Sequence, residues 1–220
     1  MKTWSYRLAP VILPVTGVAL VICLFFVHSY LADNWQWIFW PILLLVSVIS
    51  GVVTGVFIER LHQGASKDPL TGLYNRRCFY DRMNYEMEKM KRTKLPLSLA
   101  LIDIDNFKAI NDTYGHLEGD RVLVQLAGIF KSQARSGDTI VRWGGEEFAI
   151  ILPETDRSGA MVFAERVRRL VESNWKYVIT VSVGITTVWQ EYEAEKIVSI
   201  ADKALYKAKE RKNMVVYLAE

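Results

Sequence analysis

The sequence predicts an α/β (α+β) protein, with an N-terminal hairpin of two transmembrane helices and then a domain whose central sheet is flanked by helices. Two long runs, 8–32 and 34–58, contain no Asp, Glu, Lys or Arg. After them, segments with helical periodicity alternate with short apolar segments rich in Val and Ile. Connecting these segments needs both hairpins and crossovers, which favours helices packed around one sheet.

The two uncharged runs are predicted membrane spans. Each is about 25 residues long, enough for a helix to cross the ~30 Å hydrocarbon core of a bilayer. A cleaved signal peptide is the alternative for the first run, but its apolar stretch is long and a second span follows at once. We therefore assign residues 1–58 to a two-helix anchor in contact with membrane lipid.

The positions of basic residues predict the topology. Lys2 and Arg7 precede the first span, Arg60 and Lys67 follow the second, and the loop between the spans holds Asp33 but no Lys or Arg. The positive-inside rule then places both termini and the soluble domain in the cytoplasm, on a multi-pass protein of the bacterial inner membrane. The loop is too short for a ligand-binding domain, so the hairpin is either a plain anchor or reads a signal through its helices, lipid or another protein.

Cysteine content and charge narrow the function classes. Cys23 lies in the first span and Cys78 in the soluble part, so the two are not expected to pair or to bind a metal. The net charge is +3 and the basic residues are scattered along helices. Nucleic-acid binding is not expected from such a pattern.

The first half of the soluble domain, after a helical linker at 59–67, is predicted to contain three helices and a strand. Asn75 is a typical N-cap for a helix to about Met90, and it follows a turn that contains Pro and Gly. Asp120 is expected to cap a helix to about Ala134, because apolar residues recur there at i, i+3, i+4 and i+7. A buried strand, a short helix and a loop lie between them, at 97–103, 106–112 and 115–119.

The second half is predicted to complete the sheet. A β-hairpin at 139–152 surrounds two glycines, and an amphipathic helix covers 158–173. The strand at 178–185 is rich in β-branched residues, and the helix at 194–211 turns alanines inward. A last strand at 214–218 closes a domain that runs from residue 68 to 220.

The segment Arg142–Phe148, RWGGEEF, carries the first chemical signal. Its glycines can adopt positive φ and admit another group close to the backbone of the hairpin tip. The adjacent carboxylates of Glu146 and Glu147 repel each other unless a cation or solvent screens them, and Mg²⁺ is commonly held by one or two carboxylates plus substrate phosphates. An exposed acidic turn explains this segment, taken alone, equally well.

Asp103 and Asp105 form a second acidic cluster. They alternate onto one face at the end of an apolar strand, while Ile102 and Ile104 point to the other face. Placed beside the acidic hairpin, they would surround one or two metal ions, as metal-assisted phosphoryl or nucleotidyl transfer requires. The simpler interpretation, that the carboxylate caps the following helix, is favoured for Asp105 but not for Asp103.

A third cluster combines one cation with groups that suit a purine. Lys108 and Asn111 share a helix face, and Lys108 can meet a phosphate as a point charge. Asp120 can accept hydrogen bonds from the N1–H and N2–H₂ edge of guanine, with Asn111 adding a contact. Taken singly, Asp120 is explained as an N-cap, Lys108 as a solvated charge and His116 as a loop histidine.

Five motifs in order resemble the GGDEF family of diguanylate cyclases over about residues 66–220. They are DPLTGLYNRR at 68–77, DIDNFKAINDTYGHLEGD at 103–120, GGEEF at 144–148, VSVGI at 181–185 and ADKALYKAK at 201–209. The resemblance implies a fold similar to adenylyl cyclase catalytic domains and polymerase palms. It also implies a catalytic domain that condenses two GTP into cyclic di-GMP and two pyrophosphates.

The resemblance also implies roles for single residues. Asp103, the carbonyl of Ile104 and Glu146 would hold Mg²⁺, with Glu147 helping at the second of two metal ions, and Mn²⁺ is a possible substitute. Glu146 would be the general base toward the 3′-hydroxyl. The groups expected to bind GTP are Asn111 and Asp120 at guanine with His116 nearby, and Lys108 and Lys209 at the phosphates.

Regulation is implied as well. A homodimer would bring two GTP molecules face to face, one from each subunit. Arg135 and Asp138 match the family's RxxD product-inhibition site, where Arg166 would add a contact to cyclic di-GMP. The C-terminal motif AKERKN, 208–213, is one residue shorter than in the family and lacks its glycine, which leaves open whether Arg211 or Lys212 reaches a phosphate.

Two other functions remain open at this point. A catalytically silent receptor for cyclic di-GMP would show damage at Asp103, Lys108, Asp120 or Glu146, and none of these is replaced. A cyclase that makes a mixed-purine dinucleotide is opposed by Asp120, which suits guanine.

Overall fold

The computed structural model describes residues 17–19, 21–22, 24–26, 36–64, 66–173 and 178–219. The chain divides into two compact units, Met1–Ala65 and Ser66–Glu220. Most of the first predicted span lies outside the described residues, as do Cys23 and the charged residues Lys2, Arg7 and Asp33.

The first unit contains the long helix α3, Gln36–Gly64. Its segment Trp40–Phe57 has a mean hydropathy of 2.1 and is only 6% buried, so among the described residues one helix is long and apolar enough to cross a membrane. Residues 36–58 of the second predicted span therefore lie within a single helix, and residues 34 and 35 lie outside the described residues. Helical structure ends before Lys67, which already forms a β-bridge with Tyr74, so the predicted linker is not helical to its end.

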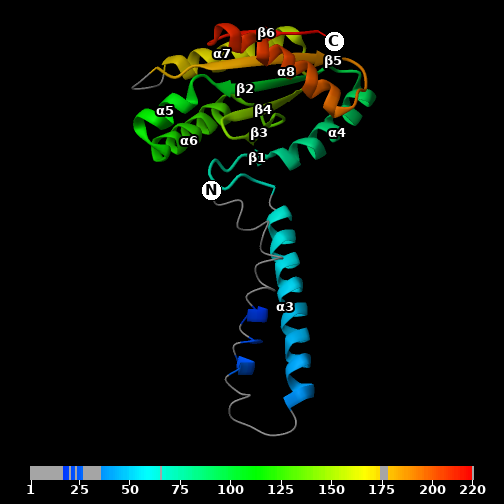
Figure 1. The fold of residues 1–220 in the computed structure, drawn as a ribbon. Coiled ribbons are helices and arrows are strands. Elements are labelled where there is room, and N and C mark those ends of the chain that lie inside the picture. Colours follow the sequence, from blue (N-terminus) through cyan, green and yellow to red (C-terminus); the bar gives the residue numbers. More distant parts are fainter. Residues whose placement is uncertain are drawn as a thin grey trace. The chain divides into compact units, whose positions relative to one another are not determined.

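The second unit has a six-stranded sheet with helices on both faces, as the sequence predicts (Figure 1). The strand order is β1-β3-β4-β2-β5-β6, with parallel pairs at both edges, β1 with β3 and β5 with β6. The strands are β1 Tyr74–Asn75, β2 Leu97–Ile104, β3 Thr139–Gly144, β4 Glu147–Pro153, β5 Val181–Val188 and β6 Val215–Tyr217.

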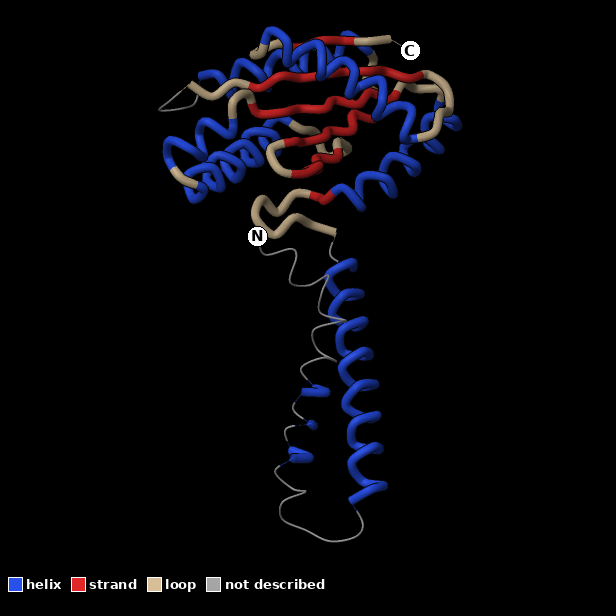
Figure 2. The backbone as a smooth tube through the Cα atoms, viewed as in Figure 1, coloured by secondary structure: helices blue, strands red, loops and turns tan. Residues whose placement is uncertain are grey.

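Helices cover both faces of the sheet (Figure 2), and each face has its own apolar core. Side chains of α5, α6 and α7 pack on one face, where Ile102 and Ile104 of β2 are buried. Side chains of α4 and α8 pack on the other face, against Leu99 and Leu101. The helices are α4 Arg76–Thr93, α5 Phe107–Tyr114, α6 His116–Gln133, α7 Arg157–Ser173 and α8 Ala194–Arg211.

Helix α8 lies unusually close to strand β5 because residue 184 is glycine. A Cβ at Gly184 would lie 2.1 Å from the backbone nitrogen of Leu205 and 2.4 Å from the carbonyl oxygen of Ala201. Real Cβ atoms do not approach backbone so closely, so only glycine permits this packing. The close approach brings the C-terminal half of α8 to the middle of the sheet.

Two predicted helix starts have different outcomes. Asn75 is confirmed as the N-cap of α4, since its side-chain oxygen accepts a hydrogen bond of 3.1 Å from the backbone N–H of Cys78. Asp120 is not an N-cap, and the predicted loop 115–119 is mostly helical, because α6 begins at His116. Gly115, with φ of 84°, ends α5 and lets α6 start at once.

Candidate active site

Glu147, the second acidic residue of the hairpin, lies directly opposite Asp103, the first carboxylate of strand β2. Strands β2 and β4 are antiparallel neighbours, with Asp103 paired to Glu147. On its other side Asp103 pairs with Ser182 of β5. The side chain of Asp103 is only 8% exposed. The sheet register thus joins two segments that lie more than forty residues apart in the sequence.

One lysine of α8 completes this cluster. The ammonium nitrogen of Lys209 lies 2.7 Å from Oδ2 of Asp103. We refer to Asp103, Glu146, Glu147 and Lys209 as the acidic cluster. Three carboxylates and one ammonium leave the cluster negatively charged overall, which favours the approach of a cation.

The groups of the acidic cluster perturb one another. Burial raises the pKa of Glu146, and the nearby carboxylates of Asp103 and Glu147 raise it further against the pull of Lys209. Burial likewise raises the pKa of Asp103, although its bond to Lys209 opposes the change. Burial alone would lower the pKa of Lys209, but Asp103 and the two glutamates outweigh it and raise that pKa.

The donor set suits a hard cation such as Mg²⁺, since all its ligating atoms are carboxylate oxygens. Within the described part of the chain, however, no group of three or more His, Cys, Asp or Glu residues is arranged to hold a metal ion as it stands. Ile104, whose carbonyl is an expected ligand, is buried in β2 opposite Val181. The residues therefore fit a divalent ion by their chemistry, and Lys209 is the cation beside Asp103 in this structure.

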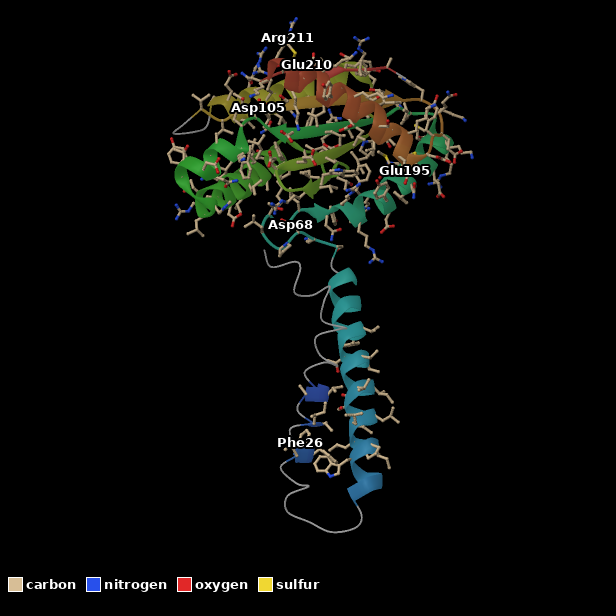
Figure 3. The ribbon with its side chains drawn as sticks, viewed as in Figure 1. Phe26, Asp68, Asp105, Glu195, Glu210 and Arg211 are labelled. Atoms are coloured by element: carbon tan, nitrogen blue, oxygen red, sulfur yellow. The ribbon has the colours of Figure 1, made fainter. Side chains whose placement is uncertain are left out.

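Asp105 does not cap the following helix, contrary to the favoured prediction. Its carboxylate accepts hydrogen bonds from Oγ1 of Thr180 at 2.7 Å, from Oγ of Ser182 at 2.7 Å and from the backbone N–H of Asn213 at 2.8 Å. Asn106 instead occupies the cap position of α5, with φ of 58° and no capping bond from its side chain. Asp105 therefore ties the end of β2 to β5 and to the chain after α8 (Figure 3).

Lys212, rather than Arg211, reaches the turn between β2 and α5. Its ammonium donates a hydrogen bond of 2.6 Å to Oδ1 of Asn106. Lys212 and Asn213 both have positive φ, 59° and 46°, so the chain turns sharply after α8. Arg211 is exposed at the end of that helix (Figure 3). Lys212 thus lies at the turn that precedes Lys108, one of the lysines expected to meet a phosphate.

The residues expected at guanine lie on α5 and in the first turns of α6. A Cβ at Gly119 would lie 2.0 Å from the side-chain oxygen of Asn111, so the amide of Asn111 lies directly over this glycine. Asp120 follows Gly119 and is exposed, and His116 is exposed in the first turn of the helix. Lys108 is exposed on α5. Free polar edges therefore remain accessible to a ligand.

The hairpin is held by an arginine that the sequence analysis did not single out. Gly145 has φ of 48°, as expected for a glycine at the tip. The guanidinium of Arg142 donates to the carbonyl oxygen of Gly145 at 2.8 Å and to both oxygens of Asp68 at 3.1 and 3.2 Å. Both side chains are mostly buried, at 16% and 17% exposure. We call this arrangement the Arg142 latch.

Asp68 is itself fixed within its turn. Its Oδ1 accepts hydrogen bonds from the backbone N–H and the hydroxyl of Thr71, at 2.8 and 2.7 Å. Lys131 of α6 donates to the carbonyl oxygen of Thr71 at 3.2 Å. In the sequence, the signals for this latch are an aspartate in a turn and an arginine next to the hairpin. Only the parallel pairing of β1 with β3 in the structure shows that these two segments meet.

The residues of the RxxD pattern line a separate hollow. Arg135, Asp138 and Arg166 border a cavity of about 190 Å³, together with residues of α7. Asp138 accepts a hydrogen bond of 2.7 Å from the backbone N–H of Arg135, and burial raises the pKa of Asp138. Arg166 donates to the carbonyl of Gln133 at 3.1 Å and lies over the ring of Phe163. The two guanidinium groups suit an anionic ligand.

Comparison with known proteins agrees with the motifs. Residues 65–214 match the family described as "Diguanylate cyclase, GGDEF domain". Diguanylate cyclase DgcP of Pseudomonas aeruginosa is 40% identical over 158 residues, which are 69% of this chain and 24% of that protein. Diguanylate cyclase DgcM of Escherichia coli K12 is 40% identical over 154 residues, 69% of this chain and 38% of that protein. The chain thus spans well under half the length of these relatives.

Solved structures show the same fold. The GGDEF domain of DgcB from Caulobacter crescentus, in complex with c-di-GMP, matches with a TM-score of 0.67 at 33% identity, covering 69% of this chain and 92% of that one. Diguanylate cyclase SiaD of Pseudomonas aeruginosa, in complex with its activator SiaC, matches with a TM-score of 0.67 at 32% identity, covering 96% and 83%.

Proposed function

The chain belongs to the GGDEF-domain family of diguanylate cyclases, and on that premise we propose that it condenses two GTP into cyclic di-GMP and two pyrophosphates. The observation that carries this proposal is the acidic cluster, in which Asp103 meets Lys209 at 2.7 Å and pairs across the sheet with Glu147. An arrangement of carboxylates beside a cation suits nucleotidyl transfer, which depends mainly on positioning and charge neutralisation.

Asp103, Glu146, Glu147 and the carbonyl of Ile104 would hold the two divalent ions, Mg²⁺ or Mn²⁺. When bound, these ions would neutralise charge on the triphosphate and on the attacking oxygen. The remaining chemistry belongs to the chain. Glu146 accepts the proton of the 3′-hydroxyl, a task for which its raised pKa makes it a stronger base.

The other roles concern recognition of the nucleotide. Asn111 and Asp120 bind the guanine edge, with His116 nearby, and Lys108, Lys209 and Lys212 contact phosphate oxygens. The exposed carboxylate of Asp120 accepts from N1–H and N2–H₂, which adenine does not offer. Adenine in this site would leave the carboxylate of Asp120 without its hydrogen-bond donors. We therefore expect GTP to be preferred strongly over ATP.

A homodimer is required because each subunit binds one nucleotide and the product contains two. In this proposal, each 3′-oxygen attacks the α-phosphorus of the nucleotide on the opposite subunit. Product inhibition would act through the hollow lined by Arg135, Asp138 and Arg166, where guanidinium groups meet the phosphates of cyclic di-GMP.

We further propose that residues 1–58 anchor the protein in the bacterial inner membrane, that 59–67 link the two parts and that 68–220 form the catalytic domain. The apolar helix α3 supports an anchor. A multi-pass topology with both termini in the cytoplasm rests on the charge pattern of the sequence.

Product analysis tests the proposal. The purified 220-residue chain with Mg²⁺ would be incubated with GTP, and separately with GTP plus ATP, and its products identified by mass. Cyclic di-GMP from both mixtures is the expected result. A mixed dinucleotide from the second mixture would contradict guanine selectivity. If the protein binds cyclic di-GMP but forms no cyclic dinucleotide, it is a receptor for cyclic di-GMP and not an enzyme.

A further inference from the structure

The ion pair between Lys209 and Asp103 places an ammonium in the position expected for a metal ion. The two charged atoms lie 2.7 Å apart, a short, charge-assisted contact. Asp103 is almost fully buried, with its side chain 8% exposed, whereas the side chain of Lys209 is 41% exposed. The carboxylate is therefore fixed, and the lysine is the partner that can move.

The surrounding groups explain why a cation is needed there. Asp103 pairs across the sheet with Glu147, and the charges of Glu146, Glu147 and Asp105 all act on the acidic cluster. Without a neutralising charge, the buried carboxylate of Asp103 and the half-buried carboxylates of Glu146 and Glu147 would repel one another. Lys209 supplies that charge from α8, which the close contact at Gly184 holds against the sheet.

An ammonium and a divalent ion cannot both neutralise Asp103 at full strength. Mg²⁺ binds carboxylate oxygen at about 2.0–2.1 Å, and two cations that share one carboxylate repel each other strongly in a partly buried site. Binding a metal ion thus requires the ammonium of Lys209 to withdraw. Its flexible stem and partial exposure permit this movement.

A triphosphate would offer Lys209 a second anionic partner. Lys212, three residues further along the chain, already reaches Asn106 in the β2–α5 turn, and Lys108 follows this turn on α5. Negative charge bound at that turn would attract Lys209 away from Asp103. The lysine then has one anionic partner before loading and another after it.

We propose that Lys209 is a resident counter-cation that holds the metal site closed until a nucleotide triphosphate draws it away, so that metal and nucleotide bind with positive coupling. This inference rests on the proposed function, because it assumes that the acidic cluster receives a metal together with a nucleotide. By linkage, any factor by which the nucleotide tightens metal binding is the factor by which metal tightens nucleotide binding.

The test measures Mn²⁺ binding to the 220-residue chain in detergent by electron paramagnetic resonance, with no turnover involved. Lys209→Met removes the charge and keeps the length of the side chain. Without nucleotide, this variant should bind Mn²⁺ about tenfold more tightly than wild type, a coupling of ordinary size. Lys209→Arg, which keeps the charge, should bind Mn²⁺ as weakly as wild type.

Two controls assign the effect to this site. Lys207→Met removes an exposed lysine two residues earlier on α8 and should leave Mn²⁺ affinity unchanged. Asp103→Asn, combined with Lys209→Met in a double variant, should abolish the tight Mn²⁺ binding that Lys209→Met alone creates. Thermal melting of each variant reports whether it folds.

A second measurement adds a non-hydrolysable GTP analogue. Because its phosphates also ligate the metal, the analogue should tighten Mn²⁺ binding in both proteins, but by about tenfold more in wild type than in Lys209→Met. Equal or weaker Mn²⁺ binding by Lys209→Met without nucleotide, relative to wild type, would overturn the inference. Failure of the proposed function gives a different result, since a protein that makes no cyclic dinucleotide from GTP can still show the competition between Lys209 and Mn²⁺.

Discussion

Glu146 shows how surroundings convert an ordinary side chain into a candidate base. Burial raises its pKa, and the carboxylates of Asp103 and Glu147 add to the effect. A base whose pKa lies nearer to the working pH transfers protons more effectively. In an isolated, exposed acidic turn, neither burial nor the carboxylate of Asp103 would raise the pKa of Glu146.

The exchange Glu146→Gln removes the base and keeps the shape of the side chain. We expect product formation to fall by about 10³-fold or more, because both proton transfer and a metal ligand are lost. The rate of cyclic dinucleotide release from GTP measures the loss, and the melting temperature of the same preparation should not fall, because removing a carboxylate whose pKa is raised in the folded state does not cost stability. Substantial remaining turnover would remove Glu146 from the mechanism.

Glu86 is a buried acid outside the site, on the inner side of α4. It is 8% exposed, its Oε2 has no hydrogen-bond partner within the described residues, and the nearest cation, Lys89, is 4.0 Å away. Burial raises the pKa of Glu86, with Lys89 and Arg82 opposing. The folded state therefore binds this proton more tightly than the unfolded state does.

This preference predicts how stability changes with pH. Since the pKa of Glu86 is higher in the folded than in the unfolded state, its ionisation costs stability as the pH rises from below about 4.5 through the raised value. Glu86→Leu should remove that cost and raise stability at neutral pH by ~1–3 kcal/mol. Melting temperatures from pH 4 to 8 measure it. A pH dependence equal to wild type would contradict this account.

At the level of elements, the Arg142 latch joins the entry turn of the domain to the acidic hairpin. One guanidinium bonds to the carbonyl of Gly145 and to both oxygens of Asp68. A planar fork is needed for such contacts, and a lysine offers only a point charge. The latch thus sets the position of Glu146, which follows Gly145 directly.

Arg142→Lys should therefore impair positioning more than folding. We expect kcat to fall about tenfold with a smaller change in KM, because small displacements of reacting groups are costly. Steady-state kinetics with GTP measure both constants. Arg169→Lys, at a side chain that is 76% exposed, is the matched control and should behave as wild type. An unchanged kcat in Arg142→Lys would show that the hairpin keeps its geometry without the latch.

The second prediction at the level of elements concerns the contact between α8 and β5, which depends on Gly184. A methyl group at Gly184 would lie 2.1 Å from the nitrogen of Leu205 and would force the helix off the sheet. Gly184→Ala should lower stability by about 3 kcal/mol or more. Gly128→Ala is the control, since nothing lies within 4 Å of a Cβ there, and it should stabilise α6 by ~1 kcal/mol. Equal melting temperatures for the two variants would refute the packing argument.

For the whole molecule, the proposed product inhibition assigns cyclic di-GMP to the cavity lined by Arg135, Asp138 and Arg166. Arg135→Ala removes one of its two guanidinium groups. The concentration of cyclic di-GMP that halves the initial rate should rise at least about tenfold, since a hydrogen bond to a charged group is lost. Initial rates with added product measure this, and the uninhibited rate should be unchanged. Equal inhibition of variant and wild type would move the inhibitory site elsewhere.

Much of this organisation was predictable from local sequence. The periodicity of α4, α7 and α8, the cap at Asn75, the glycine hairpin and the long apolar helix all depend on neighbouring residues, so their positions are close to those predicted. The start of α6 was not predictable from the capping preference of Asp120. Gly115, with its positive φ, lets the new helix begin at His116, and packing keeps the following residues helical.

The sequence by itself determined the class of fold, the family and the types of residue that carry the chemistry. Only the tertiary structure decided which of them meet. Asp103 faces Glu147 through strand register, Lys209 reaches Asp103 because Gly184 lets α8 approach the sheet, and Asp105 became a tie between strands rather than a helix cap. The physical reason is distance along the chain: caps and periodicity act within a few residues, whereas these contacts join residues from 40 to more than 100 positions apart and depend on how the elements pack.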